Sequence, residues 1–502
     1  MIVRLRSKSG ALILAVTILV SGLGFLMASA VTIALPVIQY ALGIGISQIQ
    51  WIVNSYVLVL GSLILLSGAL GDIFCAKRVF IIGVCIFTIG CVLCAISWSA
   101  GSLILFRALQ GAGAALMVPG SLTVINRVFA QDERGRVIGL WAGISGGIAA
   151  LGPFIGGVLA DISWRWVFLA LAPLGILSIF MAAFFIPDLP GRKDSRIDWV
   201  GSFLIFASLG SLSYSLILIS ENRFGAGLWG WGVAGAILLV LFLIQNARAK
   251  HPLLPPEMFN KNVSIANVTT FSLYFAFQGI FFLLSFRLQQ LHGYSALSAG
   301  LALVPSMLLI TLLTGYSGSL TDRHGPRLQM SIGSLLVTGA IGWWLFFVGD
   351  SYPMDILPGV LLLGTGMVLV IPPITKTALE VKEEFSGAAS GLNNGASRIA
   401  SLFAVALAGS VLAIIYNWTL SEQLGYLRVP SEVVAYEKAH SDLLLSAPLR
   451  RNEYTDLIKT AREYAFVKGF RYSAAVLGVA SLCAALVSFY GFTSSSAKKS
   501  KR

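Results

Sequence analysis

Long apolar stretches, separated by short charged or Gly- and Pro-containing segments, dominate the pattern of this 502-residue chain. A helix needs about 20 apolar residues to cross the hydrocarbon core of a bilayer. Fourteen stretches approach or exceed that length, near 11–36, 47–70, 79–98, 101–125, 137–159, 164–187, 199–219, 226–247, 266–289, 296–319, 328–348, 355–376, 388–416 and 470–493. The pattern predicts an all-α membrane protein with fourteen transmembrane helices.

Composition and charge agree with a chain embedded in a lipid bilayer. Hydrophobic residues make up 57% of the chain and charged residues 11%, and the mean hydropathy is +0.84. The net charge of +13 could suggest a nucleic-acid partner, but most of the 35 Lys and Arg fall in the termini and in alternate loops. Such an excess marks the cytoplasmic side of a membrane protein.

This charge pattern predicts a multi-pass protein of the bacterial cytoplasmic (inner) membrane with both termini in the cytoplasm and no nucleic-acid partner. The short outer loops carry only Arg165, Arg223 and Arg287, and 494–502 forms a basic cytoplasmic tail. The start of the chain imitates a secretory signal, with Ala28-Ser29-Ala30 as a cleavage site. Because the apolar run continues to Pro36, we expect this segment to remain as the first span.

Two cytoplasmic segments, GALGDIFCAKR at 68–78 and GSLTDRHGPR at 318–327, look like copies of one device. A carboxylate beside a Gly turn and basic residues can pair with a neighbouring helix end and latch two bundles together. The alternative is two unrelated loop turns. The residues of this predicted conformational latch are Gly68, Asp72, Lys77, Arg78, Gly318, Asp322, Arg323, Gly325 and Arg327.

The spacing of the two copies predicts two six-helix bundles with an inserted helix pair between them. The expected units are an N-terminal bundle at 1–190, the inserted pair at 191–262, and a C-terminal bundle at 263–493. The last unit includes a mixed-charge outer loop at 417–468.

One arginine, Arg107, lies within the apolar stretch LILFRALQGAGAALMVPG. A charge at the bilayer centre costs about 3 kcal/mol on insertion scales, so this arginine needs an interior partner. The alternative to a functional role is a structural pin that donates hydrogen bonds to backbone carbonyls.

The next stretch carries the small residues of ALGPFIGG, namely Gly152, Pro153, Gly156 and Gly157. They predict a bent helix that a neighbouring backbone can approach closely. Such an interface can act as a hinge, and the alternative is static helix packing.

Together these segments resemble the major facilitator superfamily, specifically its fourteen-span drug:proton antiporter branch, over nearly the whole chain. The matching positions are Gly68, Leu70, Asp72, Lys77 and Arg78; Arg107, Gln110, Gly111 and Gly113; Gly152, Pro153, Gly156 and Gly157; and the segments 49–58, 164–175, 197–201 and 389–398. The resemblance implies alternating access, and it implies a proton-relay role for Arg107 and Gln110.

The first span departs from this branch. Met27 stands where relatives usually carry an Asp, counted back from Pro36, and Thr32 replaces the usual Asn. A thioether cannot bind a proton, and none of the predicted spans places a carboxylate or histidine convincingly at mid-membrane. The first latch copy also departs, at Ile73, Cys75 and Ala76. We expect the switch between inward-open and outward-open states to survive with a shifted bias.

Aromatic and amide side chains can line a large apolar cavity with a few hydrogen-bonding groups. The candidates for a substrate cavity are Trp51, Asn54, Tyr56, Gln278 and Arg398. Without a central acid, neutral or anionic lipophilic compounds are favoured over cations. Arg398 would favour an anion if it faces the cavity, and the alternative is an anchor close to the cytoplasmic boundary.

The outer loop has helix-like spacing in VVAYEKAHSDLLL. We expect a solvated amphipathic helix, and the alternatives are a cap over the outer vestibule or a docking site for a periplasmic partner. The five cysteines lack metal-ligand spacing. We expect no metal, no cofactor and no enzymatic activity.

The expected function is therefore export of small lipophilic or drug-like molecules through the lipid bilayer by alternating access, with protons exchanged in antiport. Two alternatives stay open. One is an uncoupled or differently coupled carrier of organic anions or lipids, and the other is a non-transporting membrane scaffold or sensor.

Overall fold

The computed structural model describes residues 3–191, 198–221, 225–250, 252–349, 351–382, 385–427, 429–449 and 453–492. Within these ranges the regular structure is helical, apart from one isolated parallel bridge between Val3 and Phe129. The predicted basic tail at 494–502 and the outer-loop Arg223 lie outside the described residues.

Fourteen helical stretches are long and apolar enough to cross a membrane, which confirms the predicted all-α class and the fourteen spans. The helices are α1 Lys8–Leu42, α2 Ile46–Ile73, α3 Ala76–Ala95, α4 Ala100–Val128, α5 Arg134–Ala150, α6 Gly152–Ile162, α7 Trp164–Leu169, α8 Ala172–Phe185, α9 Trp199–Ser220, α10 Ala226–Arg248, η1 Pro256–Met258, α11 Lys261–Phe286, η2 Arg287–Leu291, α12 Ala296–His324, α13 Pro326–Phe346, η3 Tyr352–Ile356, α14 Leu357–Ala378, α15 Ser386–Tyr426, α16 Ser431–Ala439, η5 Ser441–Ser446 and α17 Thr455–Gly491.

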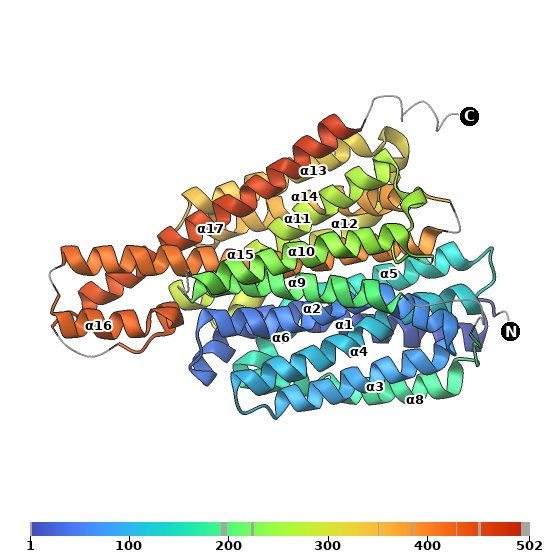
Figure 1. Cartoon of the computed structure of the whole chain (residues 1–502), viewed down its shortest axis with the longest axis horizontal. Coiled ribbons are helices and arrows are strands. Elements are labelled where there is room, and N and C mark those ends of the chain that lie inside the picture. The colour runs from blue at the N-terminus through green and yellow to red at the C-terminus, as the bar shows by residue number, and fades with distance from the viewer. Residues whose placement is uncertain are drawn as a thin grey trace.

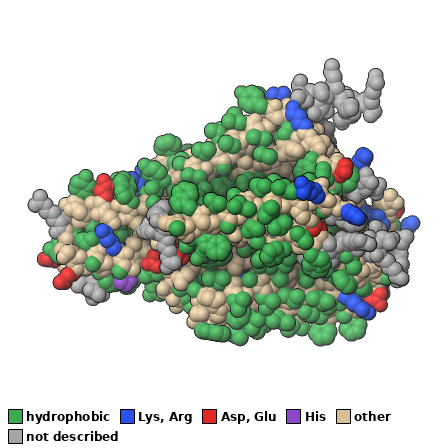
Figure 2. All heavy atoms as spheres, in the orientation of Figure 1, with side chains coloured by type: hydrophobic (Ala, Val, Ile, Leu, Met, Phe, Trp, Pro, Cys, Tyr) green, Lys and Arg blue, Asp and Glu red, His purple; other side chains and the backbone are tan. Residues whose placement is uncertain are grey.

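The helices run roughly along the long axis of the molecule, and both chain ends lie at the same end of it (Figure 1). We call this end the terminal side, and the end that carries α16 the far side. Apolar side chains cover the middle of the visible face, and charged side chains gather toward its two ends (Figure 2). This distribution is the one expected of a protein whose middle lies in hydrocarbon.

Two of the predicted spans are each built from two helices. The fifth span divides into α5 and α6 just before Pro153, and the sixth into α7 and α8 just before Pro173. A proline lacks the N–H that would bond the carbonyl four residues earlier, so it breaks or bends the helix. At the first break the Ala149 carbonyl instead accepts a hydrogen bond of 3.0 Å from the Ser29 hydroxyl of α1.

The last two spans are longer than the apolar pattern predicted. Helix α15 continues to Tyr426 instead of ending near 416, and α17 begins at Thr455 instead of near 470. Beyond the apolar stretch the two helices project from the far side together with α16 (Figure 1). The pattern missed these extensions because they pack on each other and need no continuous run of apolar residues.

The helices before and after the predicted inserted pair pack mainly among themselves. Helices α3 and α2 pack on α4, while α13, α15 and α11 pack on α17. The inserted helices α9 and α10 pack on each other, and α9 also contacts α2 and α15. Two surfaces join the two halves, one between α2 and α15 and one between α6 and α12. The unit boundaries at 190 and 262 stay predictions.

Candidate functional site

Arg107 lies inside the N-terminal half, between α2, α3 and α4, with only 1% of its surface exposed. Its Nε donates to the Ile52 carbonyl at 3.1 Å, and its Nη1 donates to Gln110 Oε1 at 2.5 Å. The Gln110 amide in turn donates to Cys91 Sγ at 3.0 Å. The guanidinium also lies 4.1 Å from the centre of the Tyr56 ring. This geometry matches the structural pin, and the proton-relay role of Arg107 and Gln110 stays a prediction.

The small residues of the predicted hinge lie at helix interfaces of α6. Gly156 faces the backbone of α1 at Ala30, while Gly157 faces the first residues of α12. A Cβ on Gly157 would lie 2.5 Å from the Ala296 carbonyl oxygen, so only glycine permits this approach. From the other side, Gly300 of α12 lies against the Pro153 carbonyl. Gly157 and Pro153 therefore contact α12 of the opposite half, whereas Gly156 and Gly152 pack on α1 within the N-terminal half, Gly152 against Ser29.

An acidic side chain closes the same contact with hydrogen bonds. The Asp161 carboxylate, at the far-side end of α6, accepts from the Ala296 amide at 2.8 Å and the Leu297 amide at 3.2 Å. Ser295 accepts from the next free amide, that of Ser298, at 3.2 Å. The N-terminus of α12 is thus capped by one residue of its own half and by one of the opposite half.

Three glutamine side chains make further hydrogen bonds between the halves. Gln289 donates to the Ile33 carbonyl at 2.8 Å, and Gln290 donates to Gln39 Oε1 at 2.8 Å. On the second surface Gln50 of α2 donates to carbonyls of α15, including that of Val405 at 3.0 Å. The two halves are therefore held together by polar contacts toward the far side.

Toward the terminal side, the α5–α6 span separates from α12. Gly147 of α5 still meets Thr311 of α12, since a Cβ there would lie 3.5 Å from the threonine methyl. One and two turns further, a Cβ on Gly143 or Gly139 would find none of the described atoms within 4 Å, and the same holds for Gly315 of α12. Along this surface, the described residues of the two halves meet toward the far side and no longer meet at Gly143, Gly139 and Gly315.

A pocket lies between the halves, where α15 faces α1, α2 and α4. It holds about 290 Å³ of empty space, including the part open to solvent. Its lining residues are Gly24, Phe25, Tyr56, Leu60, Ile64, Val118, Asn394 and Arg398. Helices α1, α2 and α4 supply the apolar side, while α15 supplies the two polar side chains. Of the predicted cavity residues, Tyr56 and Arg398 come together here.

The other predicted cavity residues lie elsewhere. The Trp51 ring packs 5.9 Å from that of Tyr214 on the inserted pair. Asn54 is fully buried and donates to Ser213 of α9 at 3.3 Å. Gln278 is half-buried on α11, apart from this pocket. Sequence alone could not separate the face of α2 that meets the pocket from the face that meets α9, because both are apolar with single polar residues.

The predicted latch residues lie at the terminal side. Lys77 pairs with Asp188, Nζ to Oδ1 3.5 Å, and Arg78 is exposed. In the second copy Arg327 donates to the Phe489 carbonyl at 2.8 Å, and Arg323 is exposed.

The turn of the second latch copy uses Gly325 at a φ of 76°, a value that favours glycine. A Cβ added to Gly318 would lie 4.0 Å from the Cβ of Pro372. Gly68, Asp72 and Asp322 belong to α2 and α12, but their side chains and surroundings are outside the described part of the structure. The latch function stays a prediction.

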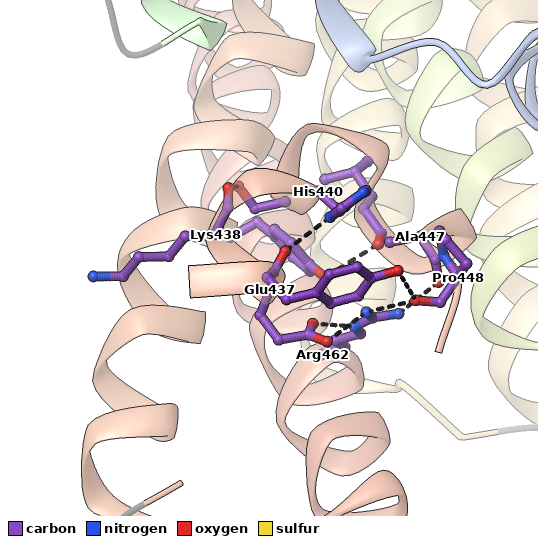
Figure 3. Close-up of polar contacts among 10 residues, drawn as sticks. Glu437, Lys438, His440, Ala447, Pro448 and Arg462 are labelled. Atoms are coloured by element: carbon purple, nitrogen blue, oxygen red, sulfur yellow. Dashed lines mark hydrogen bonds and ion pairs between the residues drawn. The ribbon is translucent and has the colours of Figure 1, made fainter. Parts of the chain in front are cut away.

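The far-side segment folds around a buried ion pair (Figure 3). Arg462 of α17 donates through Nε and Nη2 to the two Glu437 carboxylate oxygens at 2.7 and 2.8 Å, and both side chains are at most 3% exposed. Arg462 Nη1 also donates to the Ala447 carbonyl at 2.6 Å. Helix α16 is therefore a packed element and not simply a solvated amphipathic helix.

The next element, η5, touches both halves, with contacts to α1, α2, η2, α15 and α17. It lies across the closed far side, as the predicted cap over the outer vestibule would.

Sequence reasoning missed Asp161, Gln50 and Arg287. Arg287 was assigned to an outer loop, but it is fully buried in η2 and donates to the carbonyls of Trp344 and Phe347. The signal for Gln50 was available, because a lone amide within an apolar span needs an interior partner. Asp161 gave no signal, since an acid at a helix end reads as a solvated residue.

Comparison with known proteins agrees with this architecture. Residues 17–405 match the model of the Major Facilitator Superfamily. The methylenomycin A resistance protein of Bacillus subtilis is 32% identical over 423 residues, which cover 82% of this chain and 90% of the relative. The tetracenomycin C resistance and export protein of Streptomyces glaucescens is 28% identical over 496 residues, covering 94% and 91%. The multidrug resistance protein Stp of Mycobacterium tuberculosis is 29% identical over 482 residues, covering 91% and 88%.

Among solved structures, a bacterial homolog of the human lysosomal transporter Spinster, in an inward-facing and unoccupied conformation, has the same fold. Its TM-score is 0.69 at 16% identity, and the match covers 97% of each chain. Both the sequence match and the fold give one conclusion. The chain is a multi-pass integral membrane protein that belongs to the major facilitator superfamily, a family of transporters and not of enzymes.

Proposed function

We propose that this protein exports small lipophilic or drug-like molecules across the bilayer by alternating access. Relatives named for resistance to methylenomycin A and for export of tetracenomycin C support this substrate class. The two halves would open in turn at the terminal side and at the far side, with the α6–α12 contact as the moving surface. The latch residues of the terminal side would hold the opposite state.

One observation carries the proposal, namely the asymmetric separation of α5–α6 from α12. The small residues of α5–α6 contact α12 near Gly157 and Gly300. One to two turns beyond Gly147, at Gly143 and Gly139, α5 no longer contacts α12. A static bundle would keep small residues in contact along the whole α5–α6 span, because small residues in membrane helices serve close packing.

We propose that the terminal side faces the cytoplasm of a bacterial inner membrane. The basic residues of the termini and of the loops on that side support this orientation, since Lys and Arg concentrate on the cytoplasmic side. In this orientation the described state is open to the cytoplasm, ready to receive a substrate for export. Docking of a periplasmic partner on the far-side segment stays a prediction.

Proton antiport is the energy source that the fourteen-span drug:proton antiporter branch implies. A second candidate, an uncoupled carrier of organic anions, is favoured by one specific observation. Met27 is fully buried where that branch places an acid, and the described carboxylates lie near helix ends or in the far-side segment. An inside-negative potential drives an anion outward by about 2.3 kcal/mol per charge per 100 mV, without a proton carrier.

The test is efflux of cationic, neutral and anionic fluorescent compounds from proteoliposomes, with and without an imposed pH gradient. The native protein is compared with Arg107→Ala and with the control Arg471→Ala, an exposed arginine of α17. We expect flux in the native protein and the control, and loss in Arg107→Ala. Flux that ignores the pH gradient would support the uncoupled carrier. Absence of flux for every compound would contradict export and favour the scaffold.

A further inference from the structure

We propose that Arg398 selects the substrate and that the ligand bound beside it is an amphipathic organic anion. Its negative group would meet the Arg398 guanidinium, while its apolar part would meet the side of the pocket formed by Phe25 and Tyr56. This inference deepens the proposed export function and rests on it, because it names the charge class of the substrate.

Arg398 lies deep within its membrane span. Arg398 follows Ser386, the first residue of α15, by about 18 Å at a rise of about 1.5 Å per residue. Its guanidinium carbon lies 5.9 Å from the ring centre of Phe25, which is halfway along α1. The hydrocarbon core of a bilayer is about 30 Å thick, so Arg398 lies near its centre. The alternative of an anchor at the cytoplasmic boundary does not fit this position.

Arg398 differs from Arg107 and Arg287, two other arginines within the membrane, in its hydrogen bonding. Arg107 and Arg287 are fully buried, and both have hydrogen-bond acceptors: Arg107 donates to the Ile52 carbonyl and to Gln110, and Arg287 donates to two backbone carbonyls. Arg398 is half-buried and makes no ion pair with any described residue, and its Nε is buried with no hydrogen-bond partner. A buried donor without a partner is costly, and a bound anion would satisfy it.

The charged side chains that the structure describes in and beside the pocket are positive. Among the described residues, every Asp and Glu lies near a helix end or in the far-side segment, and none lines the pocket. The guanidinium of Arg107 lies behind the ring of Tyr56, on the side of the N-terminal half. A cation in the pocket would meet two positive charges without an acid to offset them, whereas an anion would be attracted by both.

The pocket lining combines apolar and polar side chains. Phe25 and Tyr56 offer ring faces, and Leu60 and Val118 add aliphatic surface. Asn394 is the second polar side chain, and its amide nitrogen already donates to the Ser390 carbonyl at 3.0 Å.

The test uses three probes that share one ring system and differ in charge, namely 1-naphthylacetate, 1-naphthylacetamide and 2-(1-naphthyl)ethylammonium. Equilibrium binding of each radiolabelled probe is measured with the full-length protein in nanodiscs. We expect the native protein to bind the acetate at least about tenfold more tightly than the amide, and the ammonium most weakly. In Arg398→Gln the acetate should bind no better than the amide, whose own affinity should stay within about twofold of native.

Two further variants separate charge recognition from folding. Arg398→Lys keeps the positive charge and should retain most of the preference for the acetate. Arg471→Gln removes an exposed arginine of α17 and should match the native protein. A thermal melt of each variant verifies that it is folded. Equal binding of acetate and amide by the native protein, preference for the ammonium, or no binding of any probe would overturn the inference.

Efflux of the same probes from proteoliposomes distinguishes this inference from the proposed function. Export of the ammonium alone would leave an exporter standing and overturn the anion site. Arg398-dependent binding of the acetate without export of any compound would support the anion site and overturn the proposed function.

Discussion

The bond between Asp161 and the start of α12 makes a direct prediction about the equilibrium between states. The Asp161 carboxylate accepts from two amides of the opposite half, those of Ala296 and Leu297, at 2.8 and 3.2 Å. Opening of the far side must break both bonds, because they cross between the halves. Asp161→Asn keeps the size of the side chain but removes its charge and one of its two acceptor oxygens.

The size of the effect follows from the chemistry of helix N-termini. A side-chain cap contributes about 1 kcal/mol, and a negative charge at the positive end of a helix contributes about 0.3–1 kcal/mol. Asparagine retains one acceptor, so we expect a loss of about 1 kcal/mol from the far-side-closed state. That loss shifts the ratio of closed to open molecules about fivefold toward open.

The assay is the distance between two spin labels placed on opposite halves at the far side. Trp98, in the loop between α3 and α4, and Met354, in η3, are 74% and 72% exposed and belong to opposite halves. Each is replaced by a labelled cysteine, in a background whose accessible cysteines are replaced by serine. The long-distance population should grow about fivefold in Asp161→Asn.

The matched control is Asp355→Asn. This aspartate accepts from the Ser351 amide at 2.9 Å, on the same side but within one half. Its substitution should leave the distances between the halves at their native values. If Asp161→Asn gave the same distance distribution as the control, the idea that this carboxylate holds the far side closed would be refuted.

Other contacts predict further effects. Arg462→Met leaves the Glu437 carboxylate buried without its partner, so we expect a loss of about 3–5 kcal/mol of stability, seen as a lower melting temperature. Lys459→Met removes an exposed pair of 4.0 Å and should change almost nothing. Gly157→Leu cannot fit against the carbonyl of α12 and should reduce transport while the protein still folds. Burial raises the pKa of Asp442, so its carboxyl stabilises the packed far-side segment most when protonated. That stabilisation is fully present below about pH 4 and is lost as pH rises through the raised pKa of Asp442. At neutral pH, amide hydrogens of 431–449 should therefore exchange more slowly in Asp442→Asn than in the native protein. In acid the two exchange rates should be equal.

Much of the fold could be predicted because hydrocarbon imposes a simple rule on the sequence. Each span needs a run of apolar residues, and fourteen such runs gave fourteen helices. Helix ends outside hydrocarbon follow a different rule. The far-side parts of α15 and α17 depend on pairings such as Glu437 with Arg462, which lie 25 residues apart in the chain. Short-range periodicity cannot show which residues meet across that separation.

The candidate site was predicted in part, for reasons that can be named. Arg398 and Tyr56 share the pocket, as the cavity hypothesis placed them, because both are polar or aromatic residues within spans. Trp51 and Asn54, on the same helix as Tyr56, instead meet α9. Their direction depends on where the inserted pair packs, which the sequence of one helix does not encode. Arg287 was misplaced because its hydrogen-bond acceptors come from the end of another span.

Alternating access is the central claim, and it is tested most directly by clamping the far side. A cysteine pair replaces Asp161 and Leu297, which already touch across the two halves. Transport is then measured in proteoliposomes before oxidation, after oxidation, and after reduction of the cross-link, with each single cysteine variant as control. The account predicts that transport stops when the cross-link forms and returns when it is reduced, while oxidation and reduction leave the transport rate of each single variant unchanged. Transport that continues at the original rate in fully cross-linked protein would contradict it.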